Sequence, residues 1–218
     1  MDYNTIGNRQ ILISAFGEKL ENDPNFYLTS PNTYVYNCIA FAMGLEDRWV
    51  DSADLPWHWW PPFPIAKGET NECLIHAFEY FGFEKCDMDD NIDEGFDKVV
   101  LYGDNGKWQH AAKVVENGIY HSKFGEAFDG IHSGGDVLEQ QYGRPFLVMR
   151  RPKKLAHLTD DLKGVFVGYC RVTEKRKMNV NGEDIEDYII FYKGKYYLER
   201  YGNEIIRVGR ELRILSKI

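Results

Sequence analysis

The spacing of apolar residues predicts three helices in the first part of the chain. Residues 8–20 place their apolar side chains at helical intervals on one side, and residues 36–43 are apolar nearly all round. A third amphipathic segment extends from Thr70, a good N-cap residue, through Phe81. Gly44 stands where a glycine commonly ends a helix. We therefore expect the second helix to be short and buried.

Strand signals dominate the remainder of the sequence. Runs rich in β-branched and aromatic residues, bounded by turn residues, predict strands over 98–102, 110–116, 119–123 and 145–150, then over 165–173, 187–192, 196–201 and 205–215. Asn117-Gly118 is the clearest hairpin signal between them. Four prolines argue against regular structure over 51–68. Helices followed by antiparallel strands predict an α+β protein.

Charge divides the chain into two parts. Residues 1–150 hold 11 Lys and Arg against 24 Asp and Glu, a formal charge of -13, whereas residues 151–218 hold 15 against 10, a charge of +5. A basic stretch with a proline, 151–154, lies at the change. We expect a domain over 1–151 and a small basic β-rich module over 152–218, an antiparallel meander. Their opposite charges favour mutual attraction.

Composition narrows the class of protein. A hydrophobic fraction of 44% indicates a folded globular chain, and no apolar run approaches the about 18 residues of a membrane span. No secretion signal is recognisable, so we expect a cytoplasmic protein by default, with delivery elsewhere only by a dedicated system. Four scattered cysteines without a C-x-x-C pair predict free thiols and no metal or other cofactor. Membrane and nucleic-acid partners are not expected, since the basic segment 171–177 lacks interleaved aromatic residues.

Cys38 is the candidate nucleophile. It lies in the first turn of the predicted 36–43 helix, where unsatisfied N–H groups and the helix dipole favour a thiolate. The same N–H groups, with Tyr36 and Asn37 nearby, are suited to stabilising an oxyanion. The alternative is a structural cysteine, because cysteine is often buried in apolar helices.

His110 is the candidate base for this thiol. It opens the predicted strand that leads to Asn117-Gly118, and Ala111 and Ala112 beside it leave room for a helix to approach. A cysteine and its base meet only in the fold, so no local signal joins them. A surface histidine at a strand end is the alternative.

Orienting the imidazole takes a third polar group. His132, and His121 or Ser122 on the strand after the predicted turn, are the candidates. Because side chains alternate along a strand, only one of His121 and Ser122 shares a face with His110, and the sequence leaves open which.

Several motifs resemble a bacterial domain family of uncharacterised function. The resemblance covers roughly 26–151 and is carried by Tyr36–Ala42, Trp59-Trp60-Pro61, His110-Ala111-Ala112, Ser122–Gly125, Ile131-His132 and Tyr142-Gly143. That family is similar in turn to the NlpC-type and CHAP-type cysteine peptidases and amidases. The resemblance implies a papain-like core, in which the cysteine-bearing helix packs on an antiparallel sheet.

The resemblance also implies roles for the candidates. Cys38 corresponds to the nucleophile, His110 to the base and His132 to a recurrent histidine taken as the third member. NlpC-type enzymes carry the third residue on the strand after the base, which favours the segment of His121, Ser122 and Lys123 instead. The implied activity is cysteine-dependent hydrolysis of an amide bond in a peptide or a peptidoglycan stem.

Two alternatives accompany this hypothesis. Trp60, in an aromatic run, is a candidate substrate platform, although such runs more often pin a loop to the core. The whole domain is alternatively a non-catalytic binding or regulatory module, for example of a bacterial toxin or defence system, because fold does not imply function. In either case the basic module offers a surface to a protein partner.

Overall fold

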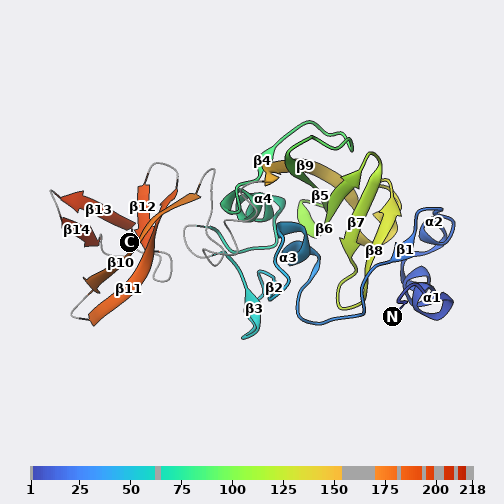
Figure 1. The fold of residues 1–218 in the computed structure, drawn as a ribbon, viewed down its shortest axis with the longest axis horizontal. Helices are drawn as coiled ribbons and strands as arrows, with labels where there is room; N and C mark the ends of the chain where they lie inside the picture. Colours follow the sequence, from blue (N-terminus) through green and yellow to red (C-terminus); the bar gives the residue numbers. More distant parts are fainter. Residues whose placement is uncertain are drawn as a thin grey trace.

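The computed structural model describes residues 2–61 and 65–153, and the backbone of five strands between residues 170 and 214. Its helices are α1 (Ile6–Phe16), α2 (Glu18–Glu21), α3 (Cys38–Met43), α4 (Asn71–Tyr80) and α5 (Glu139–Tyr142) (Figure 1). Within the described residues, no helix has both the length and the apolar character that crossing a membrane requires.

A seven-stranded sheet forms the centre of the first domain (Figure 1). Its strands are β1 (Tyr27–Leu28), β4 (Glu84–Lys85), β5 (Phe96–Asp104), β6 (Lys107–Glu116), β7 (Ile119–Lys123), β8 (Asp129–Ser133) and β9 (Arg144–Pro152). They lie in the order β1-β8-β7-β6-β5-β9-β4, and all neighbours pair antiparallel. Helices combined with an antiparallel sheet confirm the expected α+β class.

Turn chemistry sets the register of the central strands. Asn105 and Gly106 both have positive φ and join β5 to β6, and Gly118, with φ of 70°, joins β6 to β7. The four strands predicted before residue 151 are present, each extended or matched within a few residues. Strand β8 was not predicted, because Gly130 and three polar residues give it little local β propensity. Pairing with β7 and β1 supplies what its own sequence lacks.

The predicted helix over 8–20 is two helices. Gly17 has φ of 81°, a conformation that ends α1 before α2 begins. The two helices bury Leu12, Phe16 and Leu20 in a cluster with the loop that follows β7. The other two helix predictions hold: Gly44 ends α3 in the left-handed conformation, and Thr70 caps α4.

The two faces of the sheet have different surroundings. The helix face packs against α3 and α4 and includes Val99, Leu101 and Ala111. The opposite face, called here the tyrosine face, includes Tyr102, Ala112 and Tyr120, with Tyr142 packed against it. Since side chains alternate, neighbouring residues of β6 serve different faces.

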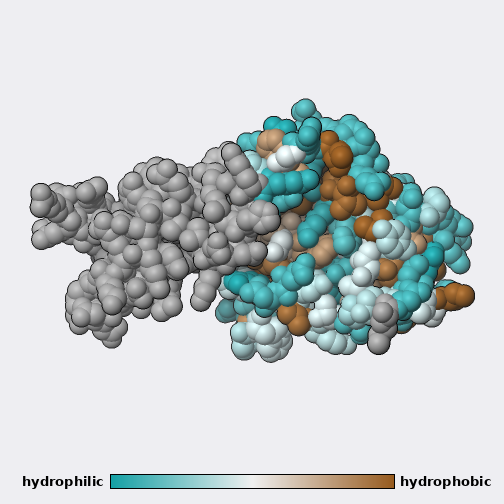
Figure 2. All heavy atoms as spheres, viewed as in Figure 1, coloured by the Kyte–Doolittle hydropathy of each residue, from teal (hydrophilic) through white to brown (hydrophobic). Residues whose placement is uncertain are grey.

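The proline-rich segment 51–68 contains one short strand, β3 (His58–Trp59), which pairs with a strand just before the segment. Strands β2 (Trp49–Val50) and β3 pair in parallel, although the prolines had argued against regular structure there. On the face shown in Figure 2, apolar side chains lie among hydrophilic ones over the described residues. Exposed apolar side chains include Trp57, Ile92 and Val115.

A separate five-stranded sheet lies in the C-terminal part. Its strands are β10 (Cys170–Val180), β11 (Glu183–Tyr192), β12 (Lys195–Leu198), β13 (Glu204–Val208) and β14 (Glu211–Ile214). They pair antiparallel in chain order, as a meander does. Residues 165–169 of the first predicted strand lie outside the described residues. So do the pairs at 181–182, 193–194 and 202–203, where a glycine in the sequence favours a turn.

Candidate active site

Cys38 begins the short helix α3. The preceding residue, Asn37, caps this helix: its Oδ1 accepts from the backbone N–H of Ala40 at 3.0 Å and of Val50 at 3.3 Å. Its Nδ2 donates to the Val50 carbonyl at 2.7 Å. The Asn37 side chain therefore fixes the helix start against β2, and its polar atoms are engaged in that role.

The Cys38 thiol lies almost out of contact with water. The residue is 7% exposed, and burial raises the pKa of its thiol to about 11. The backbone N–H groups of Ala111, Ile39 and Cys38 itself act in the opposite direction, as does the positive charge of Lys123. In this arrangement Cys38 is a protonated thiol at neutral pH, next to N–H groups that favour its thiolate.

His110, Ser122 and His132 form a hydrogen-bonded chain across three neighbouring strands. The Nε2 of His110 lies 3.0 Å from the Ser122 Oγ, which lies 2.8 Å from the Nε2 of His132. All three side chains are buried on the tyrosine face. The structure thus brings together both positions proposed for the third residue, one on β7 and one on β8, with the serine between the two imidazoles.

The carbonyl at the end of this hydrogen-bonded series determines which atom donates in each hydrogen bond. The Nδ1 of His132 lies 3.2 Å from the Ser133 carbonyl, which only accepts, so Nδ1 carries the proton. The Nε2 of His132 then accepts from the Ser122 hydroxyl, and that oxygen accepts from the Nε2–H of His110. This assignment leaves the Nδ1 of His110 as a bare lone pair, and it has no hydrogen-bond partner.

Aromatic rings hold the His110 imidazole in place. The Tyr142 ring stacks on it at 4.1 Å with an interplanar angle of 3°, and the Tyr102 ring meets it edge-on at 5.6 Å. Burial, with the nearby His132, lowers the pKa of His110 well below its usual value. The base candidate is therefore neutral, with its free nitrogen fixed in direction.

Cys38 and His110 do not hydrogen-bond to each other in this structure, because Nδ1 of the histidine has no partner. The thiol nevertheless lies beside the strand that carries His110, although Cys38 belongs to the helix face of the sheet and the imidazole to the tyrosine face. The N–H group that acts on the thiol belongs to Ala111, the residue after His110. Helix α3 packs over β6 and β7, as expected for a cysteine-bearing helix on an antiparallel sheet.

A second polar cluster surrounds Lys123. This lysine is fully buried, its Nζ donates to the Ala127 carbonyl, and burial lowers its pKa to about 8. The Tyr36 hydroxyl donates to Asp129 Oδ2 at 2.7 Å, while Oδ1 of Asp129 has no partner. Asp129 was not singled out from the sequence, because only the pairing of Lys123 with Asp129 across β7 and β8 makes them neighbours.

His121 and Trp60 lie apart from the hydrogen-bonded chain. The ring of His121 contacts Phe41 of α3 and bonds to Thr29 at 2.9 Å, so Ser122 is the residue that shares a face with His110. Burial lowers the pKa of His121 to about 4. Trp60 is buried, donates to the Ala66 carbonyl at 3.0 Å and stacks on another tryptophan, which pins its loop to the core.

The sequence that contains these residues matches a known protein family. A family described as a domain of unknown function, DUF7689, matches residues 27–150, more than half of the chain. The chain belongs to this family. The DUF7689 segment contains Cys38, the chain of His110, Ser122 and His132, and the Lys123 cluster, whereas β10 to β14 lie beyond it. No curated protein and no solved structure matches the chain.

Proposed function

We propose that this DUF7689 protein is a cysteine-dependent hydrolase that cleaves an amide bond in a peptide or a peptidoglycan stem. Cys38 is the nucleophile and His110 the base, in a papain-like core of the NlpC or CHAP kind. Ser122 and His132 hold the imidazole. The observation that carries the proposal is the orientation of His110, whose Nε2 is anchored by Ser122 while its Nδ1 lone pair is free.

The proposed reaction uses only groups of the chain, the substrate and water. Nδ1 of His110 accepts the thiol proton of Cys38, and the sulfur forms a bond to the substrate carbonyl carbon. The electron pair of the carbonyl moves to its oxygen, toward which the N–H groups at the start of α3 donate. Collapse breaks the carbon–nitrogen bond as His110 returns the proton to the leaving amine. Water, deprotonated by His110, then adds to the acyl carbon. The carbon–sulfur bond breaks, the carboxylic acid leaves, and His110 returns the proton to the sulfur of Cys38.

The chemistry requires a closer approach than the resting structure has. Thiol and Nδ1 must come within hydrogen-bond distance for the proton to move, and a substrate must reach a site whose members are buried. Catalytic hydrogen bonds are often formed only in the substrate complex. Because Cys38 belongs to the helix face and the His110 side chain to the tyrosine face, a rearrangement of α3 against β6 that brings the two atoms together is part of the proposal.

Alkylation of the cysteines directly tests the proposed pairing of Cys38 with His110. Wild-type protein is treated with iodoacetamide at neutral pH, and peptide mass spectrometry follows Cys38, Cys73 and Cys86. When the proposed rearrangement exposes the thiol and brings it to Nδ1, His110 takes its proton, so Cys38 should react at least about tenfold faster than the partly exposed Cys73. His110→Ala and Ser122→Ala should each remove most of that advantage. The proposal is contradicted if the three cysteines are alkylated at equal rates. It is also contradicted if His110→Ala leaves the alkylation rate of Cys38 unchanged.

Hydrolysis provides the second test. The full chain is incubated with a peptide mixture and with peptidoglycan stem peptides, and new amino groups are measured. Cys38→Ala should abolish release, whereas Cys73→Ala, the matched control, should leave it unchanged. Activity that survives Cys38→Ala excludes this mechanism.

A non-catalytic binding module is the second candidate. The observation that favours it is the burial of the thiol, which raises the pKa of Cys38 to about 11. A module of this kind predicts a slow Cys38 and no hydrolysis in either substrate mixture. The two proposals therefore give opposite results in both experiments.

A further inference from the structure

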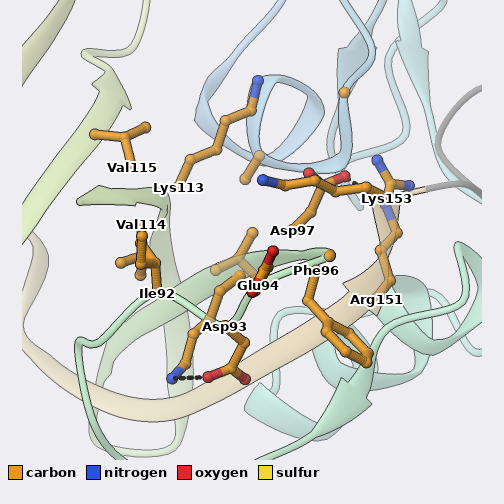
Figure 3. Close-up of a pocket in the computed structure, with 15 residues that line it drawn as sticks. Ile92, Asp93, Glu94, Phe96, Asp97, Lys113, Val114, Val115, Arg151 and Lys153 are labelled. Carbon is orange, nitrogen blue, oxygen red and sulfur yellow. Dashed lines mark hydrogen bonds and ion pairs between the residues drawn. The ribbon is translucent and has the colours of Figure 1, made fainter. Parts of the chain in front are cut away.

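A cavity on the helix face lies beyond the C-terminal end of α3. Its volume is about 700 Å³, and its walls come from Ala42 and Gly44, the loop before β5, and the ends of β5, β6 and β9 (Figure 3). None of Cys38, His110, Ser122 and His132 lines it. What it binds is therefore a question separate from the proposed hydrolysis.

Basic side chains from two strands and their extension gather at this cavity. Lys113 on β6 pairs with Val99, and Arg151 on β9 pairs with Asp97, so both flank β5 at positions of the same face. Lys153 follows at the end of β9. Figure 3 shows Lys113, Arg151 and Lys153 reaching toward the side of the cavity where α3 lies.

The two lysines have no acidic partner in the part of the chain that the structure describes. Neither Lys113 nor Lys153 forms an ion pair there, whereas Lys98 of the same wall pairs with Asp89 at 2.7 Å. The Nζ of Lys113 instead lies 3.8 Å from the centre of the Phe41 ring. Glu46, Asp97 and Asp129 attract the Lys113 ammonium from beyond ion-pair distance, while burial lowers its pKa. An anion in direct contact would stabilise the charged form of this partly buried lysine.

Arg151 is held in a fixed orientation beside them. Its Nε donates to Asp97 Oδ2 at 3.4 Å, and its guanidinium lies 4.6 Å from the centre of the Phe83 ring. Gly44, in the left-handed conformation, comes so close that a Cβ there would lie 3.1 Å from Nη2. The guanidinium is therefore a fixed positive group at the same end of the cavity.

Another side of the cavity is apolar and open to solvent. Ile92 and Val115 are exposed and line it (Figure 3). Three carboxylates line the cavity as well. Asp93 pairs with Lys98 at 3.7 Å and Asp97 with Arg151 at 3.4 Å, which leaves Glu94 without an ion pair among the described residues. Positive groups at one end and apolar side chains at another suit a ligand with an anionic head and an apolar portion.

We propose that this cavity binds an organic anion, with a carboxylate or phosphate group at Lys113 and Lys153 and an apolar portion against Ile92 and Val115. Two charge-assisted contacts bind the head, and the side chains at the mouth shield the apolar part from water. The proposal does not depend on the hydrolase activity.

Calorimetric titration of the full chain with octanoate, octyl phosphate and octylamine tests this site. At least one of the two anions should bind with a Kd below about 1 mM. The tighter of the two identifies the head group, and octylamine should not bind. Lys113→Met and Lys153→Met should each weaken binding by about tenfold or more, because each removes a charge-assisted contact.

Lys107→Met is the matched control, since Lys107 lies on β6 but pairs with Glu69 away from the cavity. It should change the Kd less than about twofold. If Lys113→Met does not fold, Lys113→Arg should retain binding and Lys153→Met still reports on the site. Absence of binding by both anions overturns the proposal. The proposal is also overturned if octylamine binds as tightly as the anions, or if Lys153→Met leaves the Kd of the anions unchanged.

Discussion

Three imidazoles, two buried and one half-buried, define the chemistry of this domain at the scale of single residues. His110 and His132 lie in one hydrogen-bonded chain through Ser122, and His121 lies on the other face. Burial lowers the pKa of all three, to about 4 for His121 and His132. The folded protein therefore holds these histidines neutral.

Neutral buried histidines make stability depend on pH. The unfolded chain binds their protons below about pH 6.5, while the folded chain binds them only near pH 4 or lower. The stabilisation is complete above about pH 6.5 and is lost as the pH falls toward 4. Each histidine contributes a slope of up to about 1.4 kcal/mol per pH unit in that range. Urea unfolding between pH 7 and 5 measures it, and a constant midpoint contradicts it.

Lys123 should control the ionisation of the Cys38 thiol. Its positive charge lowers the pKa of Cys38, so Lys123→Met should slow alkylation of Cys38 below about pH 8, where the lysine is charged. Above that pH the two proteins should react alike. Rates measured against pH by peptide mass spectrometry test this, with Lys107→Met as the control. The same rate in both proteins at pH 7 contradicts it.

At the scale of elements, α3 is the helix that positions the candidate nucleophile. It has only six residues, all buried, so its start is fixed by a cap and by packing rather than by helix propensity. Asn37 makes three hydrogen bonds: one caps the helix at Ala40, and two tie this start to Val50 of β2. Thr70 caps α4 through a single bond to the Cys73 N–H at 3.3 Å.

This difference predicts unequal costs for removing the two caps. Asn37→Ala should lower the free energy of unfolding by about 2–3 kcal/mol, because it removes the cap and leaves polar groups of Val50 unsatisfied. Thr70→Ala, at an exposed cap, should cost about 1 kcal/mol. Urea denaturation compares the two variants. A smaller loss in Asn37→Ala than in Thr70→Ala contradicts this account.

At the scale of the whole molecule, the seven-stranded and the five-stranded sheets share no strand among the described residues. The seven-stranded sheet is complete at β9, which extends through Pro152, one residue beyond the boundary expected from the sequence. The charge changes sign close to the same place, from -13 before residue 151 to +5 after residue 150. The strands of the DUF7689 segment therefore pair with one another, without a strand from the basic part of the chain.

A fragment of residues 1–153 should accordingly fold alone. Its far-ultraviolet circular dichroism should show a cooperative thermal transition within about 5 °C of that of the full chain, because each strand of its sheet keeps its partners. A fragment that ends at residue 143 loses β9 and should not fold. A fragment 1–153 without a cooperative transition shows that the two parts share one core.

The sequence by itself determined the features that depend on local chemistry. Thr70 and Gly44 bound their helices, and Asn117-Gly118 turns a central hairpin, because capping and positive φ act over a few residues. The α+β class followed from the periodicity of the apolar residues. Each of these capping and turn residues strongly prefers one backbone conformation, so its effect can be predicted without knowledge of the rest of the fold.

The tertiary structure alone decided how the candidate residues meet. Ser122 faces His110 and His121 does not, because the register between β6 and β7 selects which residue of β7 shares the tyrosine face. Strand β8, which brings His132 to the serine, has weak local propensity and exists through its pairing with β7 and β1. Burial, which keeps the imidazoles neutral and the Cys38 thiol protonated, comes from side chains far away in the sequence. Pairing and burial join residues across the chain, so no local pattern contains them.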